Sequence, residues 1–453
     1  MKITGVNLLC CEIAHYVYVL KRKGGYRVVI IVGLLLLMFF AYLGWSIIWV
    51  APVVATFVAY FSGLKVLPTY TDVYMEGFVD FAAKWFPIFL LGAVFGKLME
   101  DTGAAKSLAQ RIAKLFGSKR AILGVLIASA ILTYGGVSLF VVVFAIYPLA
   151  IALFREANVS RKLLPATIAL GAFTFTMTAI PGTPQIQNLI PTATFKTNAM
   201  SGSIIGMVSG LIMAVGGYLW LAYRDKKLKA KNQGFTEPNE SSVAASEEQD
   251  SMNIILAILP LIVVVVALNV LKWEPIVSLL IGIFSILLIN FKHYKKFISS
   301  INEGAKGSVM AVINTSAAVG FGSVITAVPE FKDVTHVLLN ISSNPLVSEA
   351  LSVQVLAMIT GSASGGMGIA LQALGDTWYH LSQTTNLSAD ALHRIASVAS
   401  GASILPHNGA LLTLLAVTGL RHKETYKDVF VVAFIITTIA LFAGVALAEA
   451  GII

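Results

Sequence analysis

Long apolar stretches, separated by short polar ones, occupy most of this chain of 453 residues. Many of them run for about 18 residues or more, which is long enough to cross the hydrocarbon core of a bilayer. None alternates between apolar and polar residues as a barrel strand does. The pattern therefore predicts an all-α polytopic membrane protein, with helices in ranges that include 28–43, 46–63, 78–99 and 307–328.

One long polar stretch interrupts this pattern near the middle of the chain. Residues 224–252 are rich in Lys, Glu and Ser and show no apolar periodicity, which is typical of a solvated linker. The linker divides the chain into a first membrane repeat, 28–223, and a second, 253–453. Residues 1–27 form an N-terminal extension of unassigned role. Their apolar part precedes their basic part, which is the reverse of a cleavable signal peptide.

Three sequence landmarks recur in the two halves at nearly the same spacing. They are Glu76-Gly77 and Glu303-Gly304 (303 − 76 = 227), Gly135-Gly136 and Gly365-Gly366 (365 − 135 = 230), and Pro181 and Pro406 (406 − 181 = 225). Their shared order and offset predict an internal repeat.

The distribution of Lys and Arg predicts the orientation of the two halves, because these residues gather in cytoplasmic loops. The basic loops are 97–120, 155–162, 292–306 and 421–428, whereas the loop around Glu330, Asp333 and Glu349 is acidic and is expected outside. The segments 121–154 and 351–374 then enter the membrane from opposite faces as hairpins. Each half is expected to hold about five transmembrane helices plus one hairpin, in inverted topology.

Composition narrows the class of function further. The chain is 57% hydrophobic and 12% charged, and its net charge of +9 is explained by the basic loops, so no nucleic-acid partner is expected. Cys10 and Cys11 are adjacent and match neither a disulfide framework nor a metal site. The chain lacks HExxH, GxSxG and Walker motifs, so we expect neither an enzyme nor an ATP-driven pump, and no metal or cofactor.

Proline and glycine interrupt two apolar runs, at IPGTPQIQN (180–188) and at LPHNG (405–409). Irregular backbone at membrane depth is tolerated only where it faces protein or water. Inverted halves with broken helices are typical of secondary transporters. The freed amides and the positive end of each restarted helix can hold an anion. Small hydroxyl residues and glycines at the two hairpin tips would add ligands near the midplane.

We therefore expect a substrate-binding site where the four breaks converge. Its candidate residues are Gly135, Gly136, Ser138, Gly182, Thr183, Gln185, Asn188, Ser362, Ser364, Gly365, Gly366, His407, Asn408 and Gly409. Amides at 182–185 and 407–409 would hold a carboxylate, and the Asn and Ser side chains would bond a hydroxyl group. His407 is the most central ionisable residue of the apolar runs and is the candidate for proton coupling. The other histidines, His393 among them, are expected in the tail, in loops or at segment ends.

Simpler explanations stay open for several of these features. A Pro-Gly break can be a packing kink, and the SASGG run at 362–366 can be a close contact between helices. Thr174 and Thr178 can serve only to bond backbone carbonyls. Asp80 and Lys84 can be interfacial groups or an ion pair.

Several motifs also resemble a known family. LPHNGALLTLLAVTGLRHKETYKD, FTMTAIPGTPQIQNLIPT and the Gly-Gly hairpins resemble the gluconate permease family of the ion transporter superfamily, over roughly residues 28–450. The nearest branch in appearance is that of the D-3-hydroxybutyrate permeases. The resemblance implies proton-coupled uptake of small hydroxylated monocarboxylates across a bacterial cytoplasmic membrane. It also implies an inverted-repeat fold, an elevator mechanism and a homodimeric scaffold.

One departure from the family pattern leaves the substrate open. Ala402-Ser403-Ile404 stands where relatives are expected to carry an Asp-Ser pair. The substrate is therefore expected to be of the gluconate or the 3-hydroxybutyrate type. Sodium coupling in place of proton coupling, and as a weaker alternative an anion channel, stay open too.

Overall fold

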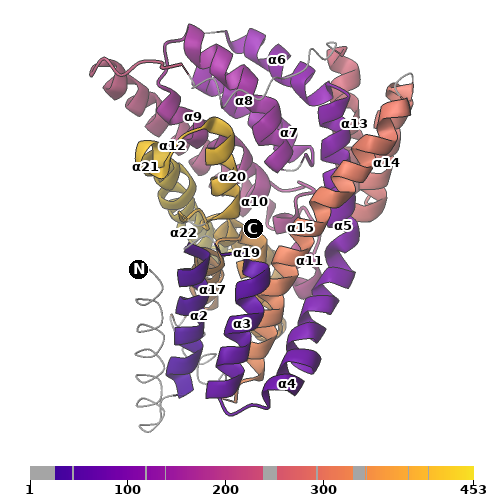
Figure 1. The fold of residues 1–453 in the computed structure, drawn as a ribbon, viewed down its shortest axis with the longest axis vertical. Helices are drawn as coiled ribbons and strands as arrows, with labels where there is room; N and C mark the ends of the chain where they lie inside the picture. The colour runs from indigo at the N-terminus through magenta and orange to yellow at the C-terminus, as the bar shows by residue number, and fades with distance from the viewer. Residues whose placement is uncertain are drawn as a thin grey trace, which may run out of the picture.

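The computed structural model describes residues 26–42, 45–117, 120–137, 139–237, 252–291, 294–329, 342, 344–385, 387–406 and 408–453. Within these ranges every regular element is a helix, which confirms the predicted all-α fold (Figure 1). Residues 1–25, most of the predicted N-terminal extension, lie outside the described residues.

The helices of the first half are α2 (Tyr26–Tyr42), α3 (Ile47–Phe61), α4 (Val66–Pro68), α5 (Met75–Asp101), α6 (Ala104–Phe116), α7 (Ala121–Tyr134), α8 (Leu139–Glu156), α9 (Leu164–Ala172), α10 (Phe175–Thr178), α11 (Ile186–Phe195) and α12 (Ser203–Lys229). Those of the second half are α13 (Ile254–Asn269), α14 (Pro275–Ile289), α15 (Tyr294–Ala327), α17 (Pro345–Thr360), α18 (Ala363–Thr384), α19 (Ala389–Ser400), α20 (Gly409–Thr418), α21 (His422–Phe430) and α22 (Ile436–Glu449). Short π-helical segments join α4 to α5 and α21 to α22, and the 3-10 turn η3 (Arg161–Leu163) precedes α9.

Four helical stretches of the described chain are long and apolar enough to cross a bilayer: Val66–Asp101, Ser203–Lys229, Tyr294–Ala327 and His422–Glu449. The helix α12 shows how their side chains are sorted. Large apolar side chains are exposed along one face, at Ile204, Met207, Leu211, Val215 and Leu219, and the opposite face is buried. Such a stripe would be costly in water, but lipid tails are as apolar as leucine. The fold is therefore that of a multi-pass membrane protein.

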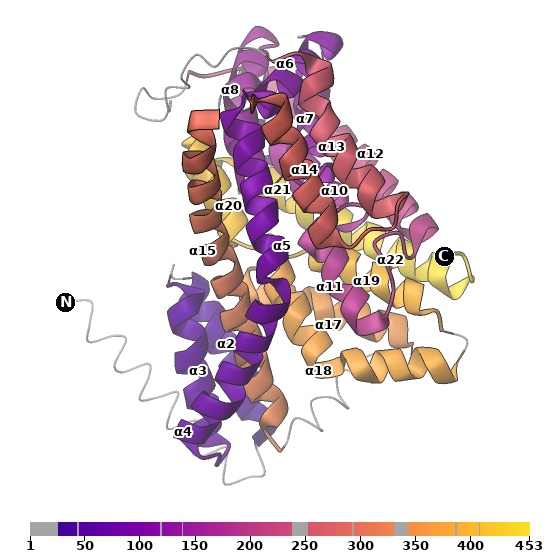
Figure 2. The ribbon, with the colours of Figure 1, turned by 90° about the vertical axis from the view of Figure 1, so that its right-hand side faces the viewer.

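The helices of the two halves correspond in order and length. α2 and α13 begin at Tyr26 and Ile254, an offset of 254 − 26 = 228, and α3 and α14 begin at Ile47 and Pro275, an offset of 275 − 47 = 228. Two hairpins, α7–α8 and α17–α18, occupy the same place in the two series. Figure 2 draws α7 and α8 toward the upper end of the molecule and α17 and α18 in its lower half. Each predicted hairpin segment therefore forms a pair of helices.

α5 and α15 lie side by side and form the most extensive contact between helices (Figure 2). Glycines permit this close approach. A Cβ on Gly77 would lie 1.9 Å from Oγ of Ser323, and a Cβ on Gly304 would lie 2.7 Å from Cα of Val94. The two contacts are reciprocal: the glycines stand 304 − 77 = 227 positions apart and their partners stand 323 − 94 = 229 positions apart. The same contact is thus made twice, once by each half.

Several predicted boundaries differ from the observed ones. α15 begins at Tyr294, so most of the predicted loop 292–306 is helical, and α12 continues to Lys229, inside the predicted linker. The predicted basic loops 97–120 and 421–428 contain α6 and most of α21, respectively. Lys, Arg and Glu are good helix formers, so a cluster of charges marks where a helix leaves the lipid rather than where it ends. Glu349 lies within α17 and is buried, so its predicted place in an external loop is wrong.

Two alanine substitutions in α15 test the close packing against α5. An added Cβ would meet the backbone of Val94 at Gly304 but nothing within 4 Å at Gly307, and both positions gain helix propensity from alanine. We expect Gly304→Ala to lower the free energy of unfolding by about 1–3 kcal/mol. Gly307→Ala should leave it unchanged or raise it. Thermal unfolding in detergent, followed by size-exclusion chromatography, makes the comparison, and equal effects of the two substitutions would contradict the close contact.

Candidate functional site

The predicted break in the first half is present between α10 and α11. α10 ends at Thr178 and α11 begins at Ile186. Gly182 has φ +81°, a left-handed conformation that favours glycine, and Pro184 has no amide hydrogen to donate. Gln185 is extended, and no side chain caps the first amides of α11. The segment 179–185 is therefore irregular backbone enclosed by helices.

The tip of the first hairpin contacts this break. Tyr134 OH donates to the carbonyl of Pro181 at 3.1 Å, and Gln185 Nε2 donates to the carbonyls of Thr133 at 2.7 Å and Val137 at 3.1 Å. A Cβ on Gly136 would lie 3.0 Å from Cγ of Pro184. Two of the predicted convergent elements, Gly135-Gly136 and 182–185, are thus brought together.

Helix α13 supplies a third side to the same place. Asn269, at its last residue, donates from Nδ2 to the carbonyl of Gly182 at 2.8 Å. A Cβ on Gly182 would lie 2.9 Å from that nitrogen, so a larger residue at position 182 would displace the amide group.

A buried arginine of the second half holds the break from behind. Arg394, in α19, is 0% exposed. Its Nε donates to Ser201 O at 3.0 Å, Nη1 donates to Ala179 O at 3.2 Å and Asn188 Oδ1 at 2.8 Å, and Nη2 donates to Ala199 O at 3.1 Å and Ser201 O at 2.6 Å. The guanidinium therefore makes five hydrogen bonds to four oxygen atoms, all of them neutral, because the Ser201 carbonyl accepts two of the bonds. No carboxylate of the described chain pairs with this cation.

Asn188 connects the arginine to the break. Its Nδ2 donates to the carbonyls of Thr183 at 2.9 Å and Ala199 at 3.0 Å, while its Oδ1 accepts from Arg394. The neighbouring His393 is also 0% exposed, with Nδ1 2.7 Å from Thr197 Oγ1 and Nε2 3.4 Å from Asn188 Oδ1. In this conformation the Asn188 amide is fully engaged in holding the backbone.

Three oxygen atoms at this junction are buried and lack a hydrogen-bond partner among the described residues. They are Thr133 Oγ1, Thr183 Oγ1 and Asn269 Oδ1. Buried polar atoms are nearly always hydrogen-bonded, so each exception calls for an explanation. Two hydroxyl groups and one amide oxygen are the kind of donors and acceptors that orient a small polar molecule.

The second break lies between α19 and α20 and meets the first one. Ser397 Oγ donates to the carbonyl of Thr178 at 2.7 Å, and a Cβ on Gly401 would lie 2.9 Å from Thr178 Oγ1. Asn408 caps α20: its Oδ1 accepts from Leu411 N at 3.1 Å, and its Nδ2 donates to Ser403 O at 3.2 Å. Gly409 is exposed. His407 and Ser138 lie outside the described residues.

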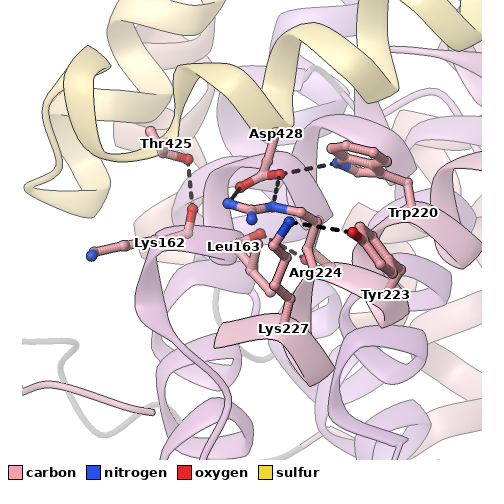
Figure 3. A network of polar contacts seen from close by, with 9 residues as sticks. Lys162, Leu163, Trp220, Tyr223, Arg224, Lys227, Thr425 and Asp428 are labelled. Atoms are coloured by element: carbon pink, nitrogen blue, oxygen red, sulfur yellow. Dashed lines mark hydrogen bonds and ion pairs between the residues drawn. The ribbon is translucent and has the colours of Figure 1, made fainter. Parts of the chain in front are cut away.

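Helix α21 holds the second break in place. His422 Nε2 lies 2.8 Å from the carbonyl of Pro406, and Tyr426 OH donates to the carbonyl of Ile404 at 3.2 Å. Figure 3 shows how α21 is itself fixed to the first half. Asp428 accepts from Arg224 Nε at 2.6 Å and Nη2 at 3.1 Å and from the Trp220 indole at 3.0 Å, all on α12. Both halves therefore contribute to both breaks.

The tip of the second hairpin uses its small residues for packing. Ser362 caps α18 by accepting from the amide of Gly365 at 3.1 Å, and Ser364 Oγ lies 3.3 Å from a threonine hydroxyl on α15. A Cβ on Gly366 would lie 2.1 Å from Cα of Ala357 on α17. These contacts agree with the reading of SASGG as a close contact between helices, and they join the tip to α15 rather than to Arg394. A ligand role for these residues stays a prediction.

Comparison with known proteins identifies the family. Residues 26–275 match the model of the GntP family permeases. The chain belongs to this family. It is 41% identical to an uncharacterized transporter of Bacillus subtilis (strain 168), YxjC, over 93% of this chain and 98% of that one. An uncharacterized transporter of Haemophilus influenzae (strain ATCC 51907 / DSM 11121 / KW20 / Rd) is 28% identical over 69% of this chain and 72% of its own.

The match makes this protein a permease, a multi-pass transporter of the cell membrane, and its family is one of transporters rather than enzymes. Sequence reasoning missed the buried pair His393 and Arg394, because His393 was expected at a segment end. The helix ADALHRIASVAS looks amphipathic, and its charges suggest a solvated face. The rule that ionisable residues inside a membrane protein are functional candidates would have found them. Thr174 and Thr178 do bond backbone carbonyls, of Leu170 at 2.6 Å and Thr174 at 3.1 Å.

Replacing Arg394 by lysine tests its structural role in the permease. Lysine keeps the charge but offers three donors on one nitrogen, so it cannot reach all the acceptors of the guanidinium. At least one buried carbonyl would be left unpaired, and we expect the free energy of unfolding to fall by about 3 kcal/mol. Arg111→Lys, at an exposed position of α6, is the control and should change nothing. Thermal unfolding of both variants in the same detergent makes the comparison. If Arg394→Lys is as stable as the wild type, the arginine does not hold the break in place.

Proposed function

We propose that this permease is a secondary active transporter that carries a small hydroxylated monocarboxylate, of the gluconate or 3-hydroxybutyrate type, into a bacterial cell together with a proton. The observation that carries the proposal is the set of unpartnered buried oxygens at the junction of the first hairpin and the first break. Thr133, Thr183 and Asn269 each have one polar atom there without a partner among the described residues. The other candidate ligands would join them as the protein moves.

The chemistry of the junction supports an anionic, hydroxylated substrate. The Thr133 and Thr183 hydroxyls and the uncapped amides of α11 can donate to a carboxylate. Asn269 Oδ1 can accept from a substrate hydroxyl. Behind the break, Arg394 is a cation without a carboxylate partner in the described chain, and its field favours an anion in front. The hydroxyl and amide donors would thus bind the anion directly, while Arg394 attracts it from behind without forming an ion pair with it.

The arrangement of the two halves supports alternating access. Matching helices at offsets close to 228 positions and the reciprocal glycine contact of α5 and α15 favour two repeats of inverted topology. In this proposal the repeats are 28–223 and 253–453, the polar linker joins them in the cytoplasm, and the first helices of each repeat build a scaffold, in a homodimer, against which the rest moves. The alternatives, sodium-coupled transport and an anion channel, are distinguished from proton coupling by the vesicle uptake assay described below.

Substitution of Thr183 by valine separates binding from folding. Valine has nearly the same shape, and the Thr183 hydroxyl has no partner to lose in the described chain. We expect unchanged or slightly higher stability, and uptake of labelled D-3-hydroxybutyrate by energised vesicles at least about tenfold slower, which corresponds to ~1.4 kcal/mol of lost binding. The control is Thr384→Val at an exposed position of α18. Full uptake by Thr183→Val would move the site elsewhere.

The same vesicles test the coupling ion and the role of His407. We expect a protonophore to abolish uptake by the wild type, gluconate to compete with it, and removal of sodium to have no effect. His407→Ala should lose the protonophore-sensitive part if the imidazole carries the proton, since its reference pKa lies near physiological pH. Uptake that needs sodium instead would refute proton coupling. Sensitive uptake that survives in His407→Ala would exclude this histidine as the essential carrier.

A further inference from the structure

The second hairpin contains a buried carboxyl group that the proposed binding site does not use. Glu349, in the second turn of α17, is 0% exposed, and neither of its carboxyl oxygens has a hydrogen-bond partner among the described residues. One turn further, Ser352 Oγ is likewise buried and unpartnered, as is Thr437 Oγ1 on α22. A bond of 2.7 Å from Gln354 Nε2 to Thr438 Oγ1 joins the two helices. The carboxyl therefore lies in a tightly packed part of the molecule.

Each described charged group on the helices around Glu349 is either hydrogen-bonded to another residue or exposed. α17 packs against α2, α18, α19 and α22. The described acidic and basic groups on α18 are Asp376 and His380, both exposed, beside the half-buried Tyr379. Those on α19 are Asp390, which is exposed, and His393 and Arg394, which are bound to the first break; α22 carries Glu449, which accepts from Asn344. The described side chains of α2 carry no charge. No described cation forms an ion pair with Glu349.

Burial without a partner decides the protonation state of this group. Removing an ionised carboxylate from water with no cation and no donor costs many kcal/mol, and such a group takes up a proton instead. A neutral carboxyl needs only one acceptor for its O–H and tolerates this site far better. In the conformation described here, Glu349 therefore carries a proton.

We propose that Glu349, rather than the sequence candidate His407, is the proton-binding site of the permease, an inference that rests on the proposed proton-coupled transport. An O–H bond forms on the Glu349 carboxylate with a proton from water on one side of the membrane as α17 packs into place. The bond breaks, and the proton returns to water on the other side, when movement of the hairpin hydrates the carboxyl. α19 packs against α17 and carries His393 and Arg394. It thereby connects the proton site with the break that binds substrate.

Replacement of Glu349 by glutamine tests this assignment, because glutamine copies the protonated carboxyl in size and neutrality. We expect Glu349→Gln vesicles to keep exchange of labelled for unlabelled substrate and to lose protonophore-sensitive accumulation. Glu349→Asp keeps a titratable group and should keep part of the accumulation. Glu156→Gln, at an exposed position at the end of α8, is the matched control. Accumulation by Glu349→Gln at the wild-type level would overturn the proposal.

A measurement without substrate makes the two proposals separable. Infrared spectra of the purified permease near neutral pH should contain the C=O stretch of a protonated carboxylic acid, absent from Glu349→Gln and shifted in Glu349→Asp. If this band is present while neither acid is transported, the proton site stands and the substrate class falls. If the wild-type spectrum lacks a band that depends on position 349, the proton site falls whatever the transport assay shows. The spectrum of Glu349→Asp serves equally if the glutamine variant does not fold.

Discussion

The satisfaction of broken backbone by one buried guanidinium is the constraint on which the rest of this permease depends. A membrane helix interrupted at Pro181 and Gly182 leaves carbonyls without helical partners, and no water of the bilayer core can replace them. Arg394 supplies donors to three of the carbonyls around the break and to the Asn188 amide, which in turn holds the strand-like segment at Thr183. The irregular segment is thus held in one shape, in which the Thr133, Thr183 and Asn269 oxygens have no hydrogen-bond partner among the described residues.

This constraint also ties the two halves together. Arg394 belongs to the second half and the carbonyls that it satisfies belong to the first, while Arg224 of the first half holds Asp428 of the second (Figure 3). α5 and α15 also join the halves: Gly77 of the first half packs against α15, and Gly304 of the second half packs against α5. Neither half can bury its polar backbone or its helix faces alone. A motion of one part against another must therefore preserve these contacts or exchange them as a set.

The local features of this fold were readable in the sequence, and the long-range ones were not. Apolar run length and Pro-Gly interruptions predicted helices and both breaks, and the charged loops on either side predicted both hairpins, because each depends on a few neighbouring residues. The partners of Arg394 stand about 200 positions earlier in the chain, so no local pattern announces them. For the same reason Asn188 and Asn408, predicted as ligands, turn out to be engaged with backbone in this conformation. Glu349 was misplaced because a charge near a helix start looks like a loop until its packing is known.

The interior treats the buried groups Arg394 and Glu349 in opposite ways, and the difference suits the proposed transport of an anion with a proton. Arg394 is surrounded by carbonyl dipoles and keeps its charge, whereas Glu349 has no hydrogen-bond donor or paired cation among the described residues and stays neutral. A fixed positive charge behind neutral hydroxyls attracts a carboxylate without sealing it in an ion pair. Because the buried carboxyl is stable only when protonated, α17 can pack in this way only while Glu349 holds a proton. In the proposed symport, one monoanion and one proton together carry no net charge, so the part that moves has the same charge with both bound as with neither, provided that Glu349 is paired with a cation or exposed to water whenever it is ionised.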